Sequence, residues 1–178
     1  MARIDDFKAN LIGGGYRVNQ FRVTITPPPG IAIGLDVRRT SFLCKATTLP
    51  AITLEPITLK YRGRSVIIAG DRETTGTWNT TFYMDTDFMI MNALQRWSNG
   101  INDFNDNTGV SSLSDYATDL TAEMIDRDDT VLKTYIFKNA WPLSVGAPPE
   151  LASDGDNTIG EFECTWQYQN YSISGVNF

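Results

Sequence analysis

The chain has 178 residues, of which 42% are hydrophobic and 20% are charged, and its formal net charge is −6. This composition is typical of a globular domain and excludes a largely disordered chain. The acidic balance argues against a protein that binds phosphate backbones through counterion release. The absence of histidine excludes every His-based triad, general base or metal ligand.

The N-terminal part is expected to be an arm that leads into one domain. Residues 1–18 are polar and include Gly13–Gly15, so we expect a flexible arm, with the domain spanning 19–178. The triple glycine has neither the preceding strand nor the Lys-Ser or Lys-Thr pair of a phosphate-binding loop. The alternating segment Asn19–Thr26 predicts a half-buried strand that ends at Pro27–Gly30.

Two further strands and a hairpin are predicted before residue 84. The alternation in Thr40–Ala46 predicts a strand with Phe42, Cys44 and Ala46 on one face. Ile57–Tyr61 and Ser65–Ala69 are close enough to form a tight hairpin. Gly76–Tyr83 is another strand, one face of which carries Trp78, Thr80 and Phe82.

One helix is predicted, from near Asp85 to Gly100. Its apolar residues recur at three-residue steps, namely Phe88, Met91, Leu94 and Trp97. Asp85, Thr86 or Asp87 can cap its N-terminus, and Gly100 is well placed to end it. A polar loop, 102–115, follows.

The C-terminal part predicts strands again. Thr118–Ile125 and Thr130–Lys138 form a second hairpin, which Trp141-Pro142 is expected to end, and 147–157 is a loop. The last strand, 159–168, alternates most regularly: Phe162, Cys164, Trp166 and Tyr168 face one way, and Glu161, Glu163, Thr165 and Gln167 the other. The fold class is therefore mainly β, a single antiparallel β-barrel or sandwich with one packed α-helix and long loops.

No catalytic, cofactor or metal site emerges from the residue pattern. The segment from Asp103 resembles a calcium loop, but its glycine falls one place late and Ser114 stands where a bidentate glutamate is required. Glu161 and Glu163 could suggest a glycosidase pair, although two carboxylates on a polar strand face are more typical of a solvated surface. Cys44 and Cys164 cannot hold zinc alone, and we expect buried, unreactive thiols.

The spacing of several segments resembles the tail tube proteins of contractile-tailed bacteriophages. Phe42–Pro50 resembles the family's "F-x-CKA-x-x-LP" signature, and Val66–Arg72 is similar to its "V-AGDR" segment. Further matches follow in order along residues 19–171, at Trp78, Arg96-Trp97, Trp141-Pro142 and Phe162–Thr165. The segments Pro27–Gly34 and Pro148–Asn157 are longer than in the best-known members.

The resemblance implies a structural virion protein and not an enzyme. Such subunits form hexameric rings that stack into a hollow tube inside a contractile sheath, and their fold is related to the type VI secretion tube. The implied partners are other copies of the chain, the tail sheath protein, the tape-measure protein, and baseplate or tail-terminator proteins. Genome DNA would pass through the lumen without specific binding. The resemblance implies no cofactor and no membrane insertion, and it implies assembly in the host cytoplasm.

Two other functions remain open from the sequence. The nearer alternative is a tube subunit of a related contractile machine, either a type VI secretion system or a phage-tail-like particle. The more distant alternative is a carbohydrate-binding or glycosidase β-sandwich.

Two segments are candidate subunit interfaces. Lys45–Tyr61 carries isolated apolar residues without an evident local partner, and we expect them to pack against a neighbouring subunit or ring; they are Leu49, Ile52, Leu54 and Ile57. Folding back onto the chain's own barrel is the alternative. Asp71 and Arg72 predict either a turn that Asp71 stabilises or a contact of Arg72 with a carboxylate of an adjacent subunit.

The polar face of the last strand is the candidate wall of the lumen. Glu161, Glu163, Thr165 and Gln167 share this face, and the strand has no basic residue on it. Because a wall of this kind does not attract DNA phosphates, we expect these four residues to line the channel. The alternative is that they face outward, toward solvent or the sheath.

Overall fold

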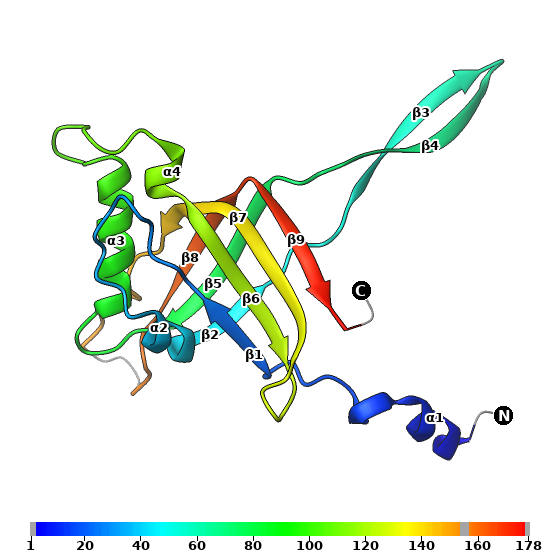
Figure 1. Cartoon of the computed structure of the whole chain (residues 1–178), viewed down its shortest axis with the longest axis horizontal. Coiled ribbons are helices and arrows are strands. Elements are labelled where there is room, and N and C mark those ends of the chain that lie inside the picture. Colours follow the sequence, from blue (N-terminus) through cyan, green and yellow to red (C-terminus); the bar gives the residue numbers. More distant parts are fainter. Residues whose placement is uncertain (1–2, 154–156, 177–178) are drawn as a thin grey trace.

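The computed structural model describes residues 3–153 and 157–176, and its body is built from two antiparallel sheets that share one long strand (Figure 1). The first sheet has the strand order β1, β6, β7, β9, with bounds Phe21–Thr24, Thr118–Ile125, Val131–Val145 and Asn170–Gly175. The second has the order β7, β8, β5, β2, the last three spanning Glu161–Tyr168, Gly76–Tyr83 and Cys44–Thr48. The predicted mainly-β class with few helices is confirmed.

Strand β7 passes from one sheet to the other. Its residues Lys133–Lys138 pair with β9, and its residues Trp141–Val145 pair with β8. The prediction that the strand ends at Trp141-Pro142 is therefore wrong. Pro142 lies opposite Trp166, next to a register shift, where a missing backbone N–H is tolerated.

The core lies between the sheets and beneath the helix α3 (Met89–Ile101). The Trp78 ring stacks on Phe137 with 4.4 Å between centroids, and Trp97 of the helix meets Trp166 edge-on at 5.5 Å. The inward faces predicted for β5 and β8 are confirmed, because all of their predicted inward side chains are buried.

The predicted helix is confirmed with a later start, at Met89. The Asp87 carboxylate accepts a hydrogen bond from the Met89 backbone N–H at 3.0 Å, while Phe88 lies outside the helix and is exposed. Gly100 does not end the helix but lies in its last turn. A Cβ there would come within 2.6 Å of Ile31, so the glycine lets the segment after β1 pack closely.

The segment 25–36 runs from β1 across this helix. Its residue Ile33 is buried, and the Arg96 guanidinium donates two hydrogen bonds to the Ile33 carbonyl at 2.9 and 2.7 Å. The predicted strand 19–26 is shorter in the structure, although Val23 is buried as expected.

The prediction of a strand over Thr40–Ala46 is wrong in its first half. A helix, α2 (Val37–Leu43), precedes β2, and Asp36 caps it by accepting a hydrogen bond from the Arg39 backbone N–H at 3.1 Å. Phe42 therefore points away from the core and is 76% exposed, whereas Cys44 is buried.

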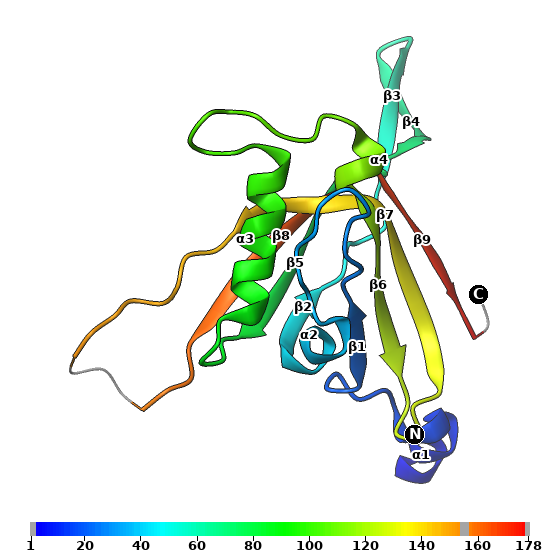
Figure 2. The same ribbon diagram turned by 60° about the vertical axis from the view of Figure 1, so that its left-hand side comes forward.

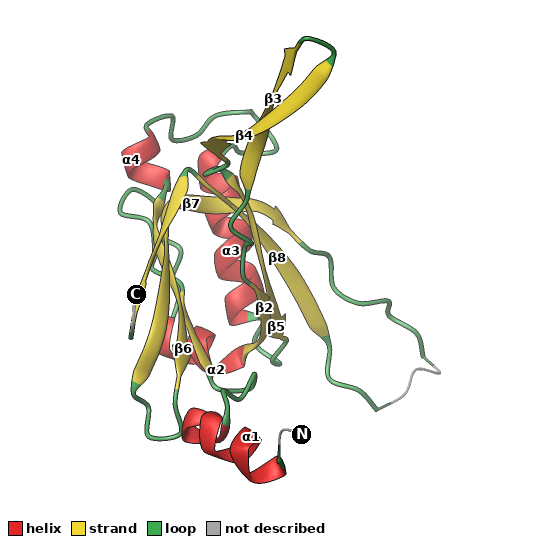
Figure 3. Ribbon diagram, turned by 90° about the vertical axis from the view of Figure 1, so that its right-hand side faces the viewer, coloured by secondary structure: helices red, strands yellow, loops and turns green. Residues whose placement is uncertain are grey.

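The predicted hairpin is confirmed and projects from the body as a separate two-stranded sheet, β3 (Leu54–Tyr61) and β4 (Arg64–Arg72). Figures 1, 2 and 3 place it at the upper end of the molecule. The arm lies at the opposite end and contains two short helices that were not predicted, α1 (Ile4–Asn10) and η1 (Ile12–Gly14).

A short helix, α4 (Leu113–Tyr116), interrupts the predicted polar loop before β6. The strands β6 and β7 form the predicted second hairpin. The predicted loop 147–157 contains no helix or strand in its described residues, and 154–156 lie outside them. Within the described part of the chain, no helix is long and apolar enough to cross a membrane.

Candidate assembly surfaces

The β3–β4 hairpin carries an apolar face with no covering partner among the described residues. The cross-strand pairs Ile57–Ile68 and Leu59–Val66 place four aliphatic side chains on one face. Each of these side chains is between 45% and 51% exposed. An isolated two-stranded hairpin is marginally stable at best in water. This apolar hairpin face therefore presents four partly exposed aliphatic side chains that a partner could cover.

The residues predicted for the interface differ in their surroundings. Ile52 and Leu54 are exposed, at 53% and 51%. Leu49 is less exposed, because it packs against the core cluster and lines a groove of about 260 Å³ beside β2. The expectation that none of these residues has a local partner is wrong for Ile57, which pairs with Ile68 across the hairpin. The alternative of folding back onto the body is realised only at Leu49.

Asp71 and Arg72 lie within β4 and not in a turn. The turn of this hairpin is Arg62-Gly63, so the expectation that Asp71 stabilises a turn is wrong. Both side chains are exposed, and in the described part of the chain neither forms an ion pair.

The polar face of β8 is directed away from the core, as predicted. Glu161 binds Lys45 of β2, with both carboxylate oxygens 2.6 Å from the ammonium, and this hydrogen bond raises the pKa of Lys45. The Glu163 carboxylate is exposed and has no ion pair among the residues that the structure describes. Neighbouring β5 adds more polar side chains to this face, at Thr77, Asn79 and Thr81. The result is a polar sheet surface with one paired and one free carboxylate.

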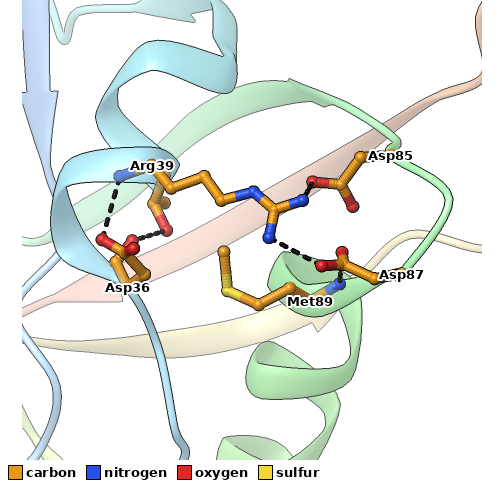
Figure 4. Close-up of polar contacts among 6 residues, drawn as sticks. Asp36, Arg39, Asp85, Asp87 and Met89 are labelled. Carbon is orange, nitrogen blue, oxygen red and sulfur yellow. Dashed lines mark hydrogen bonds and ion pairs between the residues drawn. The ribbon is translucent and has the colours of Figure 1, made fainter.

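A network around Arg39 was not predicted from the sequence. Its guanidinium lies 2.6 Å from Asp85 and 2.6 Å from Asp87, which precede α3 (Figure 4). The hydrogen bond from Arg39 holds the pKa of Asp87 below its ordinary value. The network fixes α2 against the start of α3, and it therefore sets the direction of the exposed Phe42 side chain. The capping motif at Asp36 was the available sequence signal for α2.

The two thiols are buried, as predicted. Burial raises the pKa of Cys44 to about 12 and raises that of Cys164 as well. Thiolates are the reactive form, so neither residue is a nucleophile in the folded chain.

The acidic loop after α3 uses its carboxylates to hold its own backbone. Asp103 accepts from the Asn105 backbone N–H at 2.8 Å, and Asp106 accepts from the Thr108 hydroxyl at 2.8 Å. Across residues 3–153 and 157–176, no group of three or more Cys, Asp or Glu side chains is arranged to hold a metal ion.

Comparisons with known proteins agree with this architecture. Residues 16–174 match the family model described as phage tail tube protein. A tail tube protein of Serratia phage KSP90 is 28% identical over 94% of this chain and 95% of its own length. The tail tube protein gp19 of Enterobacteria phage T4 is 32% identical over 91% and 94%.

Solved structures share the fold at lower identity. A chain of the anti-feeding prophage tube-terminating cap superimposes with a TM-score of 0.63 at 16% identity, covering 90% of this chain and 91% of that one. A chain of the sheath-tube complex of an extracellular contractile injection system, PVC, gives a TM-score of 0.56 at 18% identity, with 99% and 100% coverage.

Proposed function

Because the chain belongs to the phage tail tube protein family, we propose that it is the subunit of hexameric rings that stack into the tube of a contractile phage tail. The observation that carries this proposal is the family match, which spans residues 16–174 and leaves out only residues 1–15 and the last four residues. The chain is accordingly a structural component of the virion tail.

The phage assignment is favoured over the other contractile machines by sequence identity. The phage relatives are 28–32% identical along more than 90% of both chains, whereas the injection-system chains, at 16–18%, share the fold alone. Two of these injection-system chains come from a sheath-tube complex and from a sheath/tube terminator. By analogy, we infer that this chain binds a tail sheath protein and a terminator, encloses a tape-measure protein and starts from a baseplate. Its assembly would take place in the host cytoplasm.

We infer that the chain has no enzymatic role. The glycosidase alternative requires two free carboxylates with separated pKa values, but Glu161 is occupied by Lys45. The two thiols are buried and protonated.

The polar face of β8 is our proposal for the wall of the lumen. Glu163, Thr165 and Gln167 face away from the core, and Lys45, a base on the neighbouring surface, is neutralised by Glu161. A wall without free bases avoids sequence-independent attraction of the DNA phosphates, and its hydroxyl and amide groups keep it hydrated. This arrangement would let DNA slide through stacked rings.

The apolar hairpin face is our proposal for the contact with the adjacent ring. It would bury side chains that are about half exposed in the single chain, Ile57 and its three neighbours. The arm 1–18 would be ordered by a neighbouring subunit in the same way, because Ile4 and Phe7 of α1 are 73% and 66% exposed. Arg72, without an ion pair in the described residues, would reach a carboxylate of an adjacent subunit.

Negative-stain electron microscopy of the purified chain tests the proposal. We expect rings with sixfold symmetry, and tubes at higher concentration. A protein that stays monomeric at every concentration, or that binds or hydrolyses glycans in an array screen, would contradict it.

A further inference from the structure

The tip of the β3–β4 hairpin is a concentrated positive site on an acidic chain. Lys60, Arg62 and Arg64 surround the turn, and the sequence has no acidic residue between Pro56 and Gly70. All three side chains are exposed, and none forms an ion pair within residues 3–153 and 157–176. Arg64 shares the apolar hairpin face and Arg62 lies at the turn beyond it, whereas Lys60 alternates to the opposite face, so a partner that covers the apolar face also meets the positive charges of Arg64 and Arg62.

An exposed acidic turn lies at the other end of the molecule. The connection between β6 and β7 carries Asp126, Asp128 and Asp129 with one base, Arg127, and all four are exposed. The Asp128 carboxylate accepts hydrogen bonds from Thr130, which hold its pKa below the ordinary value, so it stays ionised. Only Asp129 has a described ion pair, a long one of 3.5 Å with Arg22.

The two sites lie at opposite ends in three views. Figures 1, 2 and 3 are related by rotation about the vertical, and in each the hairpin is uppermost while the β6–β7 turn lies at the lower end. When two copies are stacked in the same orientation along the vertical of these views, the hairpin of one points toward the lower end of the next. Such a contact is heterologous and does not close, which is the geometry of a filament.

We propose that the basic tip of the hairpin binds the β6–β7 turn of a copy in the adjacent ring. This inference rests on the proposed function and identifies the partner surface of the hairpin. The other acidic loop, which holds Asp103 and Asp106, lies at the same upper end of the molecule as the hairpin, on the other side of it, and is not reached in a head-to-tail stack (Figures 1 and 2). Exposed charge pairs contribute mainly orientation and association rate, so the charges set the register in which the apolar hairpin face docks.

Charge exchange tests the pairing. The tip variant is Arg62→Glu with Arg64→Glu, and the turn variant is Asp126→Lys with Asp128→Lys. The matched control for the turn is Asp103→Lys with Asp106→Lys, because each of these four carboxylates accepts a hydrogen bond from a nearby backbone N–H. Tube growth from purified protein is followed by light scattering and microscopy, in about 50 mM and about 500 mM salt, since screening is much stronger at the higher concentration.

We expect the tip variant to keep its rings and its melting temperature but to need roughly tenfold more protein for tubes, a factor that corresponds to about 1.4 kcal/mol. Adding the turn substitutions to the tip variant should restore growth, whereas adding the control substitutions should not. High salt should reduce the difference between the wild type and the tip variant. Normal growth of the tip variant, or rescue by the control and not by the turn, would overturn the pairing while leaving the tube function intact. A wild-type chain that forms no rings would instead refute the function on which the pairing rests.

Crosslinking gives a second, independent readout. A chain with Arg62→Cys and Asp128→Cys should form a ladder of disulfide-linked oligomers under oxidation, and a chain with Arg62→Cys and Asp106→Cys should not. The native thiols do not compete, because Cys44 and Cys164 are buried. No ladder in assembled tubes, or equal ladders for both pairs, would contradict the proposed contact.

Discussion

Truncating the apolar hairpin face should weaken tube growth without unfolding the subunit. The perturbation is Leu59→Ala with Val66→Ala, a cross-strand pair whose side chains are 51% and 50% exposed in the single chain. Full burial of such a side chain is worth about 1.5–3 kcal/mol, so covering the exposed half contributes about 1 kcal/mol for each. The double variant should therefore lose about 2 kcal/mol per ring-to-ring contact, or roughly 30-fold in its equilibrium constant.

The control for this variant lies on the opposite face of the same hairpin. Thr58 and Ile67 form the adjacent cross-strand pair, and Ile67 is 69% exposed. Thr58→Ala with Ile67→Ala should change polymerisation much less, although it alters the same two strands. Sedimentation velocity gives the fraction in tubes, and circular dichroism gives the melting temperature, which neither variant should shift appreciably because the side chains are exposed. Equal growth of the Leu59/Val66 variant and the control would refute the assignment of this face to the ring contact.

Three further predictions concern the body of the subunit. Arg39→Gln should lower the melting temperature at pH 7; because the Arg39 hydrogen bond depresses the pKa of Asp87 in the folded chain, this contribution is fully present above the ordinary carboxyl pKa of about 4, and the difference between variant and wild type should shrink as the pH falls below that value. Iodoacetamide should leave both cysteines of the native chain unmodified at pH 8, since burial raises the pKa of Cys44 to about 12, and mass spectrometry should detect labelling only after denaturation. Glu161→Lys with Glu163→Lys should leave rings intact and slow genome ejection, more so at low salt; normal ejection kinetics would exclude this face as the lumen.

The strands with a regular two-residue alternation were predictable because one face of each is buried. Trp78 and Phe82 on β5, and Phe162 and Trp166 on β8, are buried as the alternation indicates. The same rule failed at Thr40–Ala46. Only the last turn of α2, Thr40–Leu43, falls in this segment, and four residues are too few to distinguish the helical period from the alternation of a strand. There the Asp36 cap decides in favour of the helix.

Features that depend on distant partners were not predictable from local patterns. Pro142 was taken as the end of a strand, but pairing with β8 carries the strand past it. The strand β9 is rich in Asn, Ser and Gly, and it forms because β7 presents an open edge. Arg39 binds Asp85 and Asp87, which lie 46 and 48 positions after it in the sequence. No local spacing rule predicts a contact over such a distance along the chain. Of the residues predicted for an interface, Ile52, Leu54 and Ile57 are exposed in the single chain and Leu49 is partly buried, and their contact with another subunit stays a prediction.

The long strand β7 has a mechanical consequence for a subunit that carries load. At about 3.4 Å per residue, its 15 residues have a contour length of about 50 Å, and β9 and β8 pair with its first and second parts, on either side of a bend at Asn139, whose φ is 50°. A force directed along β7 loads these backbone hydrogen bonds in shear, so many must break together and not one after another. Because the strand belongs to both sheets, neither sheet can separate without the other. Forced unfolding in a single-molecule pulling experiment should accordingly show one rupture for the whole body, at high force.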